Sequence, residues 1–115
     1  MITLERIYGE TPPYHGYRVL VDRMWPRGIS KEEAHLDEWM KEVGPSKDLI
    51  EGFHHGEISW DDFKKQYWME LNHKPDLIGR LKDLARKDGV VLLYGSKDVE
   101  HNQAVVLKEY LTTHS

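Results

Sequence analysis

The chain of 115 residues contains no cysteine. Disulfide bonds and catalysis by a thiolate are therefore excluded, and a reducing compartment is compatible with the sequence. The chain also lacks an apolar run of about eighteen residues and an apolar N-terminal segment of the signal-peptide type. We therefore expect neither export nor a membrane span, and we expect a cytoplasmic protein.

An excess of positive charge is lacking as well. Sixteen lysines and arginines stand against 20 aspartates and glutamates, which gives a formal net charge of −4. This balance argues against broad nucleic-acid binding, and no helix-turn-helix pattern is evident. The chain has no internal repeat and no linker long enough to divide it, so we expect one domain over residues 1–115.

The most informative stretch is GYRVLVDRMWPRG, residues 16–28. Its Val19-Leu20-Val21 run is apolar on both faces of a pleat, which is typical of a strand covered on both sides in an α/β sheet. We predict that strand over residues 17–22. The charged loop that follows contains Pro26, which restricts the backbone and stiffens the loop.

Other segments complete a coarse secondary-structure prediction. Strands are expected over residues 2–8 and, in the apolar VVLLY run, over residues 90–94. The first strand and the strand over residues 17–22 would be antiparallel if they paired directly, because the proline-containing loop between them, residues 9–16, is short. Capping signals and apolar spacing predict five helices, over residues 30–43, 46–53, 59–71, 75–88 and 100–111.

Strands separated by helices imply parallel pairs joined by crossovers. We therefore predict an α/β fold with a small, mainly parallel sheet of about three strands, covered by about five helices. In such a sheet the loops after the strands meet at the carboxyl edge, where ligands usually bind. The loop residues Arg23, Trp25 and Arg27 would then face a second group, consisting of Lys97, Asp98, His101 and Asn102.

Arg23 and Arg27 are the clearest candidate ligand-binding residues. A guanidinium offers paired donors to a phosphate or carboxylate, and a helix N-terminus would add a positive dipole end. The alternative is structural: Asp22 with Arg23, or Arg18 with a helix carboxylate, would form ion pairs. Glu70, on an otherwise apolar helix, is a further candidate partner for Arg18 or Arg23.

His101 with Asp98 three residues earlier could form an acid–base pair, or could be an ordinary surface histidine at a helix start. Asn102 could donate to an anion or cap the helix. Ser46 and Ser96 have no nucleophile-elbow context, so capping and turn roles are the simpler expectation. The seven histidines show no metal-ligand spacing, and we expect neither a metal nor a cofactor.

Motifs along nearly the whole chain resemble the DUF488 family, specifically its short single-domain branch. After GYRVLVDRMWPRG come Lys31, Trp39 and the Pro45-Ser46 pair, then an F-x3-Y-x2-EL pattern at residues 63–71. The closing signature is LLY, KD and HN-x-A, at Leu92–Tyr94, Lys97-Asp98 and His101–Ala104.

The resemblance implies an α/β fold and marks as motif positions Asp22, Arg23, Trp25, Pro26, Arg27, Lys97, Asp98, His101 and Asn102. It implies no reaction, because the family is named for its unknown function. Longer relatives carry a C-H-R ending where this chain has His101-Asn102 without a cysteine. Any thiol-based activity of those relatives therefore cannot be transferred.

The leading functional hypothesis is an enzyme acting on a small anionic substrate, nucleotide-like or phosphate-like, by a hydrolytic or transfer reaction. Arg23 and Arg27 would hold the anion, Trp25 would wall or stack on it, and Asp22 or His101 would move protons. The alternative is a noncatalytic binding module or sensor that uses the same residues. A nucleic-acid regulator ranks third, and the sequence predicts no oligomeric state.

Overall fold

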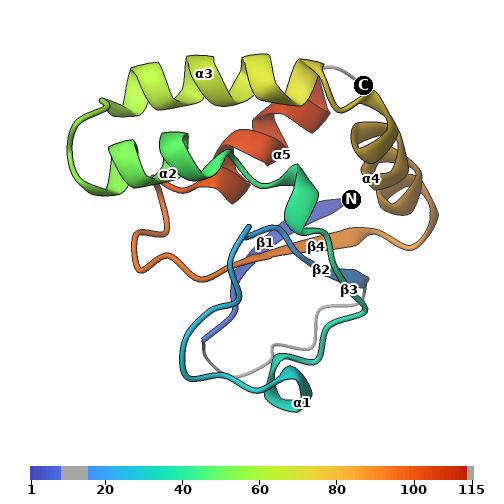
Figure 1. Cartoon of the computed structure of the whole chain (residues 1–115). Coiled ribbons are helices and arrows are strands. Elements are labelled where there is room, and N and C mark those ends of the chain that lie inside the picture. The colour runs from blue at the N-terminus through green and yellow to red at the C-terminus, as the bar shows by residue number, and fades with distance from the viewer. Residues whose placement is uncertain (9–15, 114–115) are drawn as a thin grey trace.

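The computed structural model describes residues 1–8 and 16–113. Their fold is α/β, with a sheet of four strands in the order β1-β4-β2-β3 (Figure 1). The strands are β1 (Ile2–Arg6), β2 (Tyr17–Leu20), β3 (Glu38–Trp39) and β4 (Val90–Tyr94), and all three neighbouring pairs are parallel. The predicted fold class is confirmed, with one more strand than the three expected.

Strand β4 is central because every one of its five side chains is apolar and buried. Leu92 at its midpoint pairs with Leu4 of β1 on one side and with Val19 of β2 on the other. β1 and β2 therefore do not pair directly. The antiparallel arrangement was expected only for direct pairing, so that expectation does not apply. The loop predicted for residues 9–16 lies, except for Gly16, outside the described residues.

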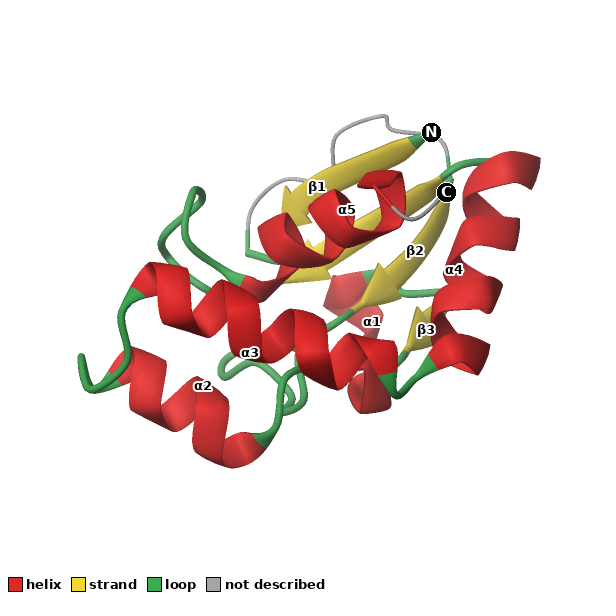
Figure 2. Ribbon diagram, turned by 90° about the horizontal axis from the view of Figure 1, so that it is seen from above, coloured by secondary structure: helices red, strands yellow, loops and turns green. Residues whose placement is uncertain are grey.

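Four helices cover one face of the sheet (Figures 1 and 2): α2 (Lys47–His54), α3 (Trp60–Asn72), α4 (Pro75–Lys87) and α5 (Gln103–Thr113). Helix α5 lies against β1 and β4, and α3 packs on α5 and α2. Phe63, Tyr67 and Leu71 of α3, four residues apart, are fully buried because this spacing places them on one helical face. None of the helices in residues 1–8 and 16–113 is long and apolar enough to cross a membrane.

The opposite face is covered by the segment between β2 and β3, which contains the short helix α1 (Lys31–Ala34). Ala34 is buried there against Leu20, Val91 and Leu93 of the sheet, and the partly buried side chains Trp25, Ile29, Leu36 and Trp39 complete the cluster. The chain that follows β2 therefore turns to one face of the sheet, while the chain that follows β4 leads to α5 on the other.

The predicted helix over residues 30–43 is wrong beyond Ala34. The capping box at Ser30 is present, but the helix ends at His35, which has a left-handed φ of 51°. The Asp37 and Met40 amides then donate to carbonyls of β2, at 2.9 and 3.0 Å, and the segment forms β3 and a 3₁₀ turn over Lys41–Val43. Strand pairing at the open edge of β2 outweighed a short helix that is marginal alone.

The last helix begins at Gln103, three residues later than the predicted Glu100. The Asp98 carboxylate accepts the Glu100 and His101 amides and holds residues 98–101 in a turn. Asn102 then provides the cap. The other predicted helices are confirmed, including Ser46 and Ser59 as N-caps and Pro75 in the first turn of α4.

Candidate functional site

The candidate site is the carboxyl end of the β2–β4 pair. We call residues 21–28 and 95–103, which follow these two strands, the carboxyl rim. Because β2 and β4 are parallel neighbours, their downstream loops begin side by side, and they then diverge to opposite faces of the sheet. Such a switch point is where open α/β sheets commonly bind ligands.

Asp22 joins the two halves of the carboxyl rim. Its Oδ2 accepts the Gly95 amide at 2.9 Å, and its Oδ1 accepts the side-chain amide of Gln103, the first residue of α5. Its backbone carbonyl accepts the Trp39 indole N–H at 2.7 Å. A Cβ on Gly95 would lie 2.9 Å from Asp22 Oδ2, so a side chain at this position would displace the Asp22 carboxylate.

Burial raises the pKa of Asp22 to about 6, although the hydrogen bonds from Gly95 and Gln103 act in the opposite direction. No lysine, arginine or histidine in the described part of the chain forms an ion pair with this carboxylate. Asp22 can therefore gain or lose a proton near neutral pH.

This pKa predicts a pH-dependent stability. A carboxyl group with a raised pKa binds more protons folded than unfolded, so stability falls as pH rises from about 4 through about 6. A rise from 3.8 to about 6 corresponds to roughly 3 kcal/mol, and partial exposure reduces the expectation to about 2 kcal/mol. Urea unfolding of wild type and Asp22→Asn over this range should diverge by that amount. Parallel curves would contradict the burial of a charge at Asp22.

Arg23 binds backbone carbonyls of the segment before α2. Its Nε donates to the Pro45 carbonyl at 2.7 Å and its Nη2 to the Gly44 carbonyl at 2.9 Å. The Lys74 ammonium donates to the same Gly44 carbonyl at 3.1 Å, and burial lowers the pKa of Lys74. Arg23 thus fixes the segment before α2; its role as a ligand-binding residue stays a prediction.

We call residues 43–46 the junction, since side chains from three parts of the fold converge on its backbone. Besides Arg23 and Lys74, the Tyr67 hydroxyl donates to the Val43 carbonyl at 2.8 Å. Glu70 accepts both the Ser46 amide, at 2.8 Å, and the Ser46 hydroxyl, at 2.6 Å.

The sequence had suggested Arg18 or Arg23 as a partner for Glu70, whereas the hydrogen bonds of Glu70 go to Ser46. Arg18 instead pairs with Glu5 of β1 at 2.7 Å. Arg18 therefore forms a structural ion pair, as the alternative interpretation predicted, but its partner is a carboxylate on a strand and not on a helix.

Trp25 and Arg27 occupy the part of the rim that leads to α1. The Trp25 indole donates to the Ile29 carbonyl at 2.8 Å, and its ring packs edge-on against Trp39 at 5.3 Å. The Trp25 side chain is therefore partly buried and forms one side of the rim. Arg27 is exposed, and its carbonyl accepts the Tyr8 hydroxyl.

On the other half of the rim, Asp98 and His101 form the predicted pair. The His101 Nδ1 lies 3.1 Å from Asp98 Oδ2, and its ring packs edge-on against Trp60 at 5.0 Å. Amides of Glu100 and His101 that donate to Asp98 hold the pKa of this carboxyl below its usual range. Both side chains are about half exposed.

Asn102 is 2% exposed and caps α5. Its Oδ1 accepts the Val105 amide at 3.1 Å, and its Nδ2 donates to the Asp98 carbonyl at 2.8 Å. The capping alternative is therefore what the structure shows. Gln103, which the sequence analysis missed, is the rim's second buried polar residue; a glutamine at a helix start carries no signal that could have singled it out.

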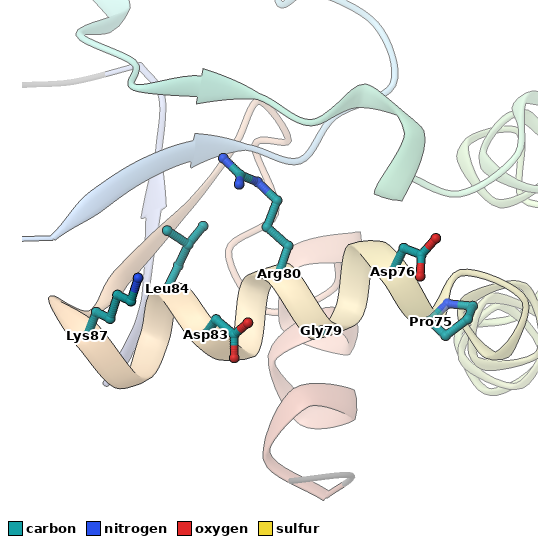
Figure 3. A pocket seen from close by; sticks show the side chains of 7 residues that line it. All are labelled: Pro75, Asp76, Gly79, Arg80, Asp83, Leu84 and Lys87. Atoms are coloured by element: carbon teal, nitrogen blue, oxygen red, sulfur yellow. The ribbon is translucent and has the colours of Figure 1, made fainter.

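The rim therefore brings together Asp22, Gly95 and Gln103, and it presents Arg27 and Lys97 as exposed cations without an ion pair in the described part of the chain. No group of three potential metal ligands occurs within residues 1–8 and 16–113. Two shallow surface grooves lie elsewhere. One runs along α4, where Arg80 reaches across to pair with Glu38 of β3 (Figure 3), and the other lies between α3 and α5.

A family model described as the inactive DUF488-N3 subclade matches residues 1–115. The chain belongs to the DUF488 family. The chain is similar to the uncharacterized protein YeaO of Escherichia coli K12, which is 42% identical over 110 residues, 96% of each chain. The uncharacterized proteins Mb3100c of Mycobacterium bovis and Rv3073c of Mycobacterium tuberculosis are each 36% identical, over 96% of this chain and 92% of theirs. No solved structure matches significantly.

Proposed function

We propose that this DUF488 protein is a noncatalytic module that binds a small anion at the carboxyl rim. The observation that carries the proposal is the switch point between β2 and β4, whose loops diverge to opposite faces and are joined at their base by Asp22. Small ligands favour this position because backbone donors and side chains from two loops converge there.

The charges on the rim support an anion as the ligand. Arg27 and Lys97 are exposed, one on each loop, and the loop that contains Lys97 leads to the positive end of the eleven-residue helix α5. A phosphate or carboxylate group held between the two loops would meet cations from both sides.

We expect the protein to be located in the cytoplasm.

We propose a noncatalytic module because several polar side chains of the rim already stabilise the fold. Asp98 holds the turn before α5, Asn102 caps α5, and Arg23 fixes the junction. Groups committed to the fold in this way are poorly placed to move during a reaction. The description of the family as an inactive subclade agrees with this reading.

An enzyme remains the second candidate because one observation favours it. The pKa of Asp22, raised to about 6 by burial, is suited to proton transfer at neutral pH. Turnover of any phosphate ester or phosphosugar that is lost in Asp22→Asn would decide for the enzyme. Binding without turnover, by wild type and Asp22→Asn alike, would decide for the module.

The binding prediction is tested by calorimetry with sulfate, phosphate, nucleotides and small carboxylates. We expect Arg27→Ala and Lys97→Ala each to weaken binding of a detected anion about fivefold, as the loss of a solvent-exposed ion pair worth about 1 kcal/mol implies. Lys87→Ala is the matched control, since Lys87 is exposed at the end of α4 that leads into β4, at the edge of the sheet opposite to the rim. Equal losses in all three variants, or no anion bound by wild type, would refute the proposal.

A further inference from the structure

Helix α4 carries a row of charges of alternating sign on its outer side. The row consists of Asp76, Arg80, Asp83 and Lys87, which follow one another at spacings of four, three and four residues. All four side chains are exposed, and they line the shallow groove along α4 (Figure 3). Residues at these spacings lie on one face of a helix, so the row is continuous along α4.

The two ends of the row have no partner within the described chain. Asp76 and Lys87 form no ion pair in residues 1–8 and 16–113. They cannot pair with each other within one helix, because a rise of about 1.5 Å per residue holds them roughly 16 Å apart. The residues described around this groove all belong to α4, so the row faces away from the rest of the fold.

The two central charges are paired within the chain but keep free atoms. Arg80 binds Glu38 of β3 through Nε and Nη2, which leaves the two protons of Nη1. Asp83 accepts Arg86 at Oδ1, which leaves Oδ2. Each of these central side chains can therefore take a further partner of opposite charge without losing the pair that it has.

The row is complementary to itself when it is reversed. In an antiparallel second copy of α4, Asp76 can face Lys87 of that copy. The same register places Arg80 opposite Asp83 of the second copy, because both pairs are centred between residues 81 and 82. A twofold axis repeats each contact, so four ion pairs form and no like charges meet. Spacings of four and three residues are also those at which two helices stay in contact along their length.

Gly79 in the same groove favours contact with another helix. Glycine inside a helix is less stable than alanine, so its presence in the middle of α4 has a cost. A Cβ at Gly79 would meet no atom within 4 Å, and packing within the chain therefore does not require glycine there. The missing side chain lets a second helix approach the α4 backbone closely.

We propose that two copies of this chain associate through α4, antiparallel and about a twofold axis beside residues 81 and 82. Charge complementarity identifies the occupant of the groove as a second copy, since the row matches its own reverse at every position. The proposal is independent of anion binding at the carboxyl rim.

The dimer should be weak and sensitive to salt. A helix of 13 residues is about 20 Å long, so this contact belongs with the transient interfaces that bury less than roughly 1,200 Å². We expect a Kd on the order of 100 μM at low salt. The Kd should rise with ionic strength, because solvent-exposed ion pairs are screened.

The test is an exchange of charges, followed by sedimentation equilibrium at about 0.01 M ionic strength. Asp76→Lys places the new lysine opposite Lys87 of the second copy, and Lys87→Asp places the new aspartate opposite Asp76. Each variant turns two attractive pairs into two repulsive pairs, so its Kd should rise about thirtyfold. The double variant Asp76→Lys/Lys87→Asp restores opposite charges and should dimerise as wild type does.

A mixture of the two single variants gives the sharpest result. Asp76→Lys and Lys87→Asp should form a heterodimer with each other, although neither associates with itself, because every facing pair then has opposite charges. A folding defect cannot produce this outcome. Glu51→Lys is the matched control, since Glu51 is exposed on α2 and the substitution changes the net charge as much as Asp76→Lys does. It should leave the Kd unchanged.

Wild type that stays monomeric at about 1 mM protein would overturn the inference. A dimer that both single variants leave unchanged would also overturn it, because another surface would then hold the two copies together. Failure of the double variant and of the mixture to associate would do the same, since it would show that opposite charges at positions 76 and 87 do not form the contact.

Discussion

Arg23→Ala is expected to lower the free energy of unfolding by about 3 kcal/mol. The guanidinium makes two charged hydrogen bonds to consecutive carbonyls of the junction, at 2.7 and 2.9 Å. Each such bond is worth roughly 1.5–3 kcal/mol, and Lys74 still serves the Gly44 carbonyl when Arg23 is lost. Urea unfolding at neutral pH measures the change.

Arg27→Ala is the matched control, because Arg27 is exposed on the same loop and should change stability by less than about 0.5 kcal/mol. Arg23→Lys should fall between wild type and Arg23→Ala, since an ammonium cannot reproduce the planar pair of donors. If Arg23→Ala kept full stability and lost anion binding, Arg23 would be the ligand-binding residue that the sequence predicted.

Phe63→Ala should have the largest effect, a loss of about 4 kcal/mol, as is typical when a fully buried aromatic ring is removed from a core. Phe63 stacks on Phe53 at 4.5 Å and on Trp60 at 5.8 Å, and contacts Tyr67 at 5.9 Å. Its loss leaves a cavity under three rings. The midpoint of urea unfolding should fall while its slope stays constant.

Phe53→Ala serves as the comparison for Phe63, because Phe53 belongs to the same aromatic cluster but is only partly buried. We expect Phe53→Ala to cost about half as much as Phe63→Ala. Equal losses for the two variants would show that the cluster unfolds as a unit and that burial does not set the cost. Trp60 supports the His101 ring edge-on, so Phe63→Ala should also loosen the loop after β4.

The parts of the fold that sequence could predict are those where local signals and tertiary packing agree. VVLLY, residues 90–94, is apolar at every position and became the central strand; Ser46, Ser59 and Pro75 begin the helices that they predicted. The meeting of the loops after β2 and β4 followed from parallel topology alone, and Asp22 confirms that contact through its bond to Gly95.

What the sequence could not predict depends on partners far along the chain. Residues 36–43 have helical apolar spacing, yet their amides pair with β2, a competitor that no local pattern reveals. The binding of Arg23 to the carbonyls of residues 44 and 45 could not be predicted, because backbone carbonyls leave no trace in the pattern of side chains. Gln103 had no signal at all, since its role arises only when Asp22 lies 81 positions away along the chain but within bonding reach.

The junction also bears on how the chain can be re-engineered. Its backbone at residues 43–46 accepts donors from the loop after β2, from α3 and from Lys74, the residue before α4. Gly44 lies so close to Val21 and Arg23 that a side chain there would meet backbone at 3.0 Å. A tag, a new terminus or a reporter spliced into these residues would pull all these contacts out of register at once. The exposed turn at residues 55–57 offers a far better place to cut, because its side chains face solvent and its backbone amides bond only to neighbouring carbonyls of α2.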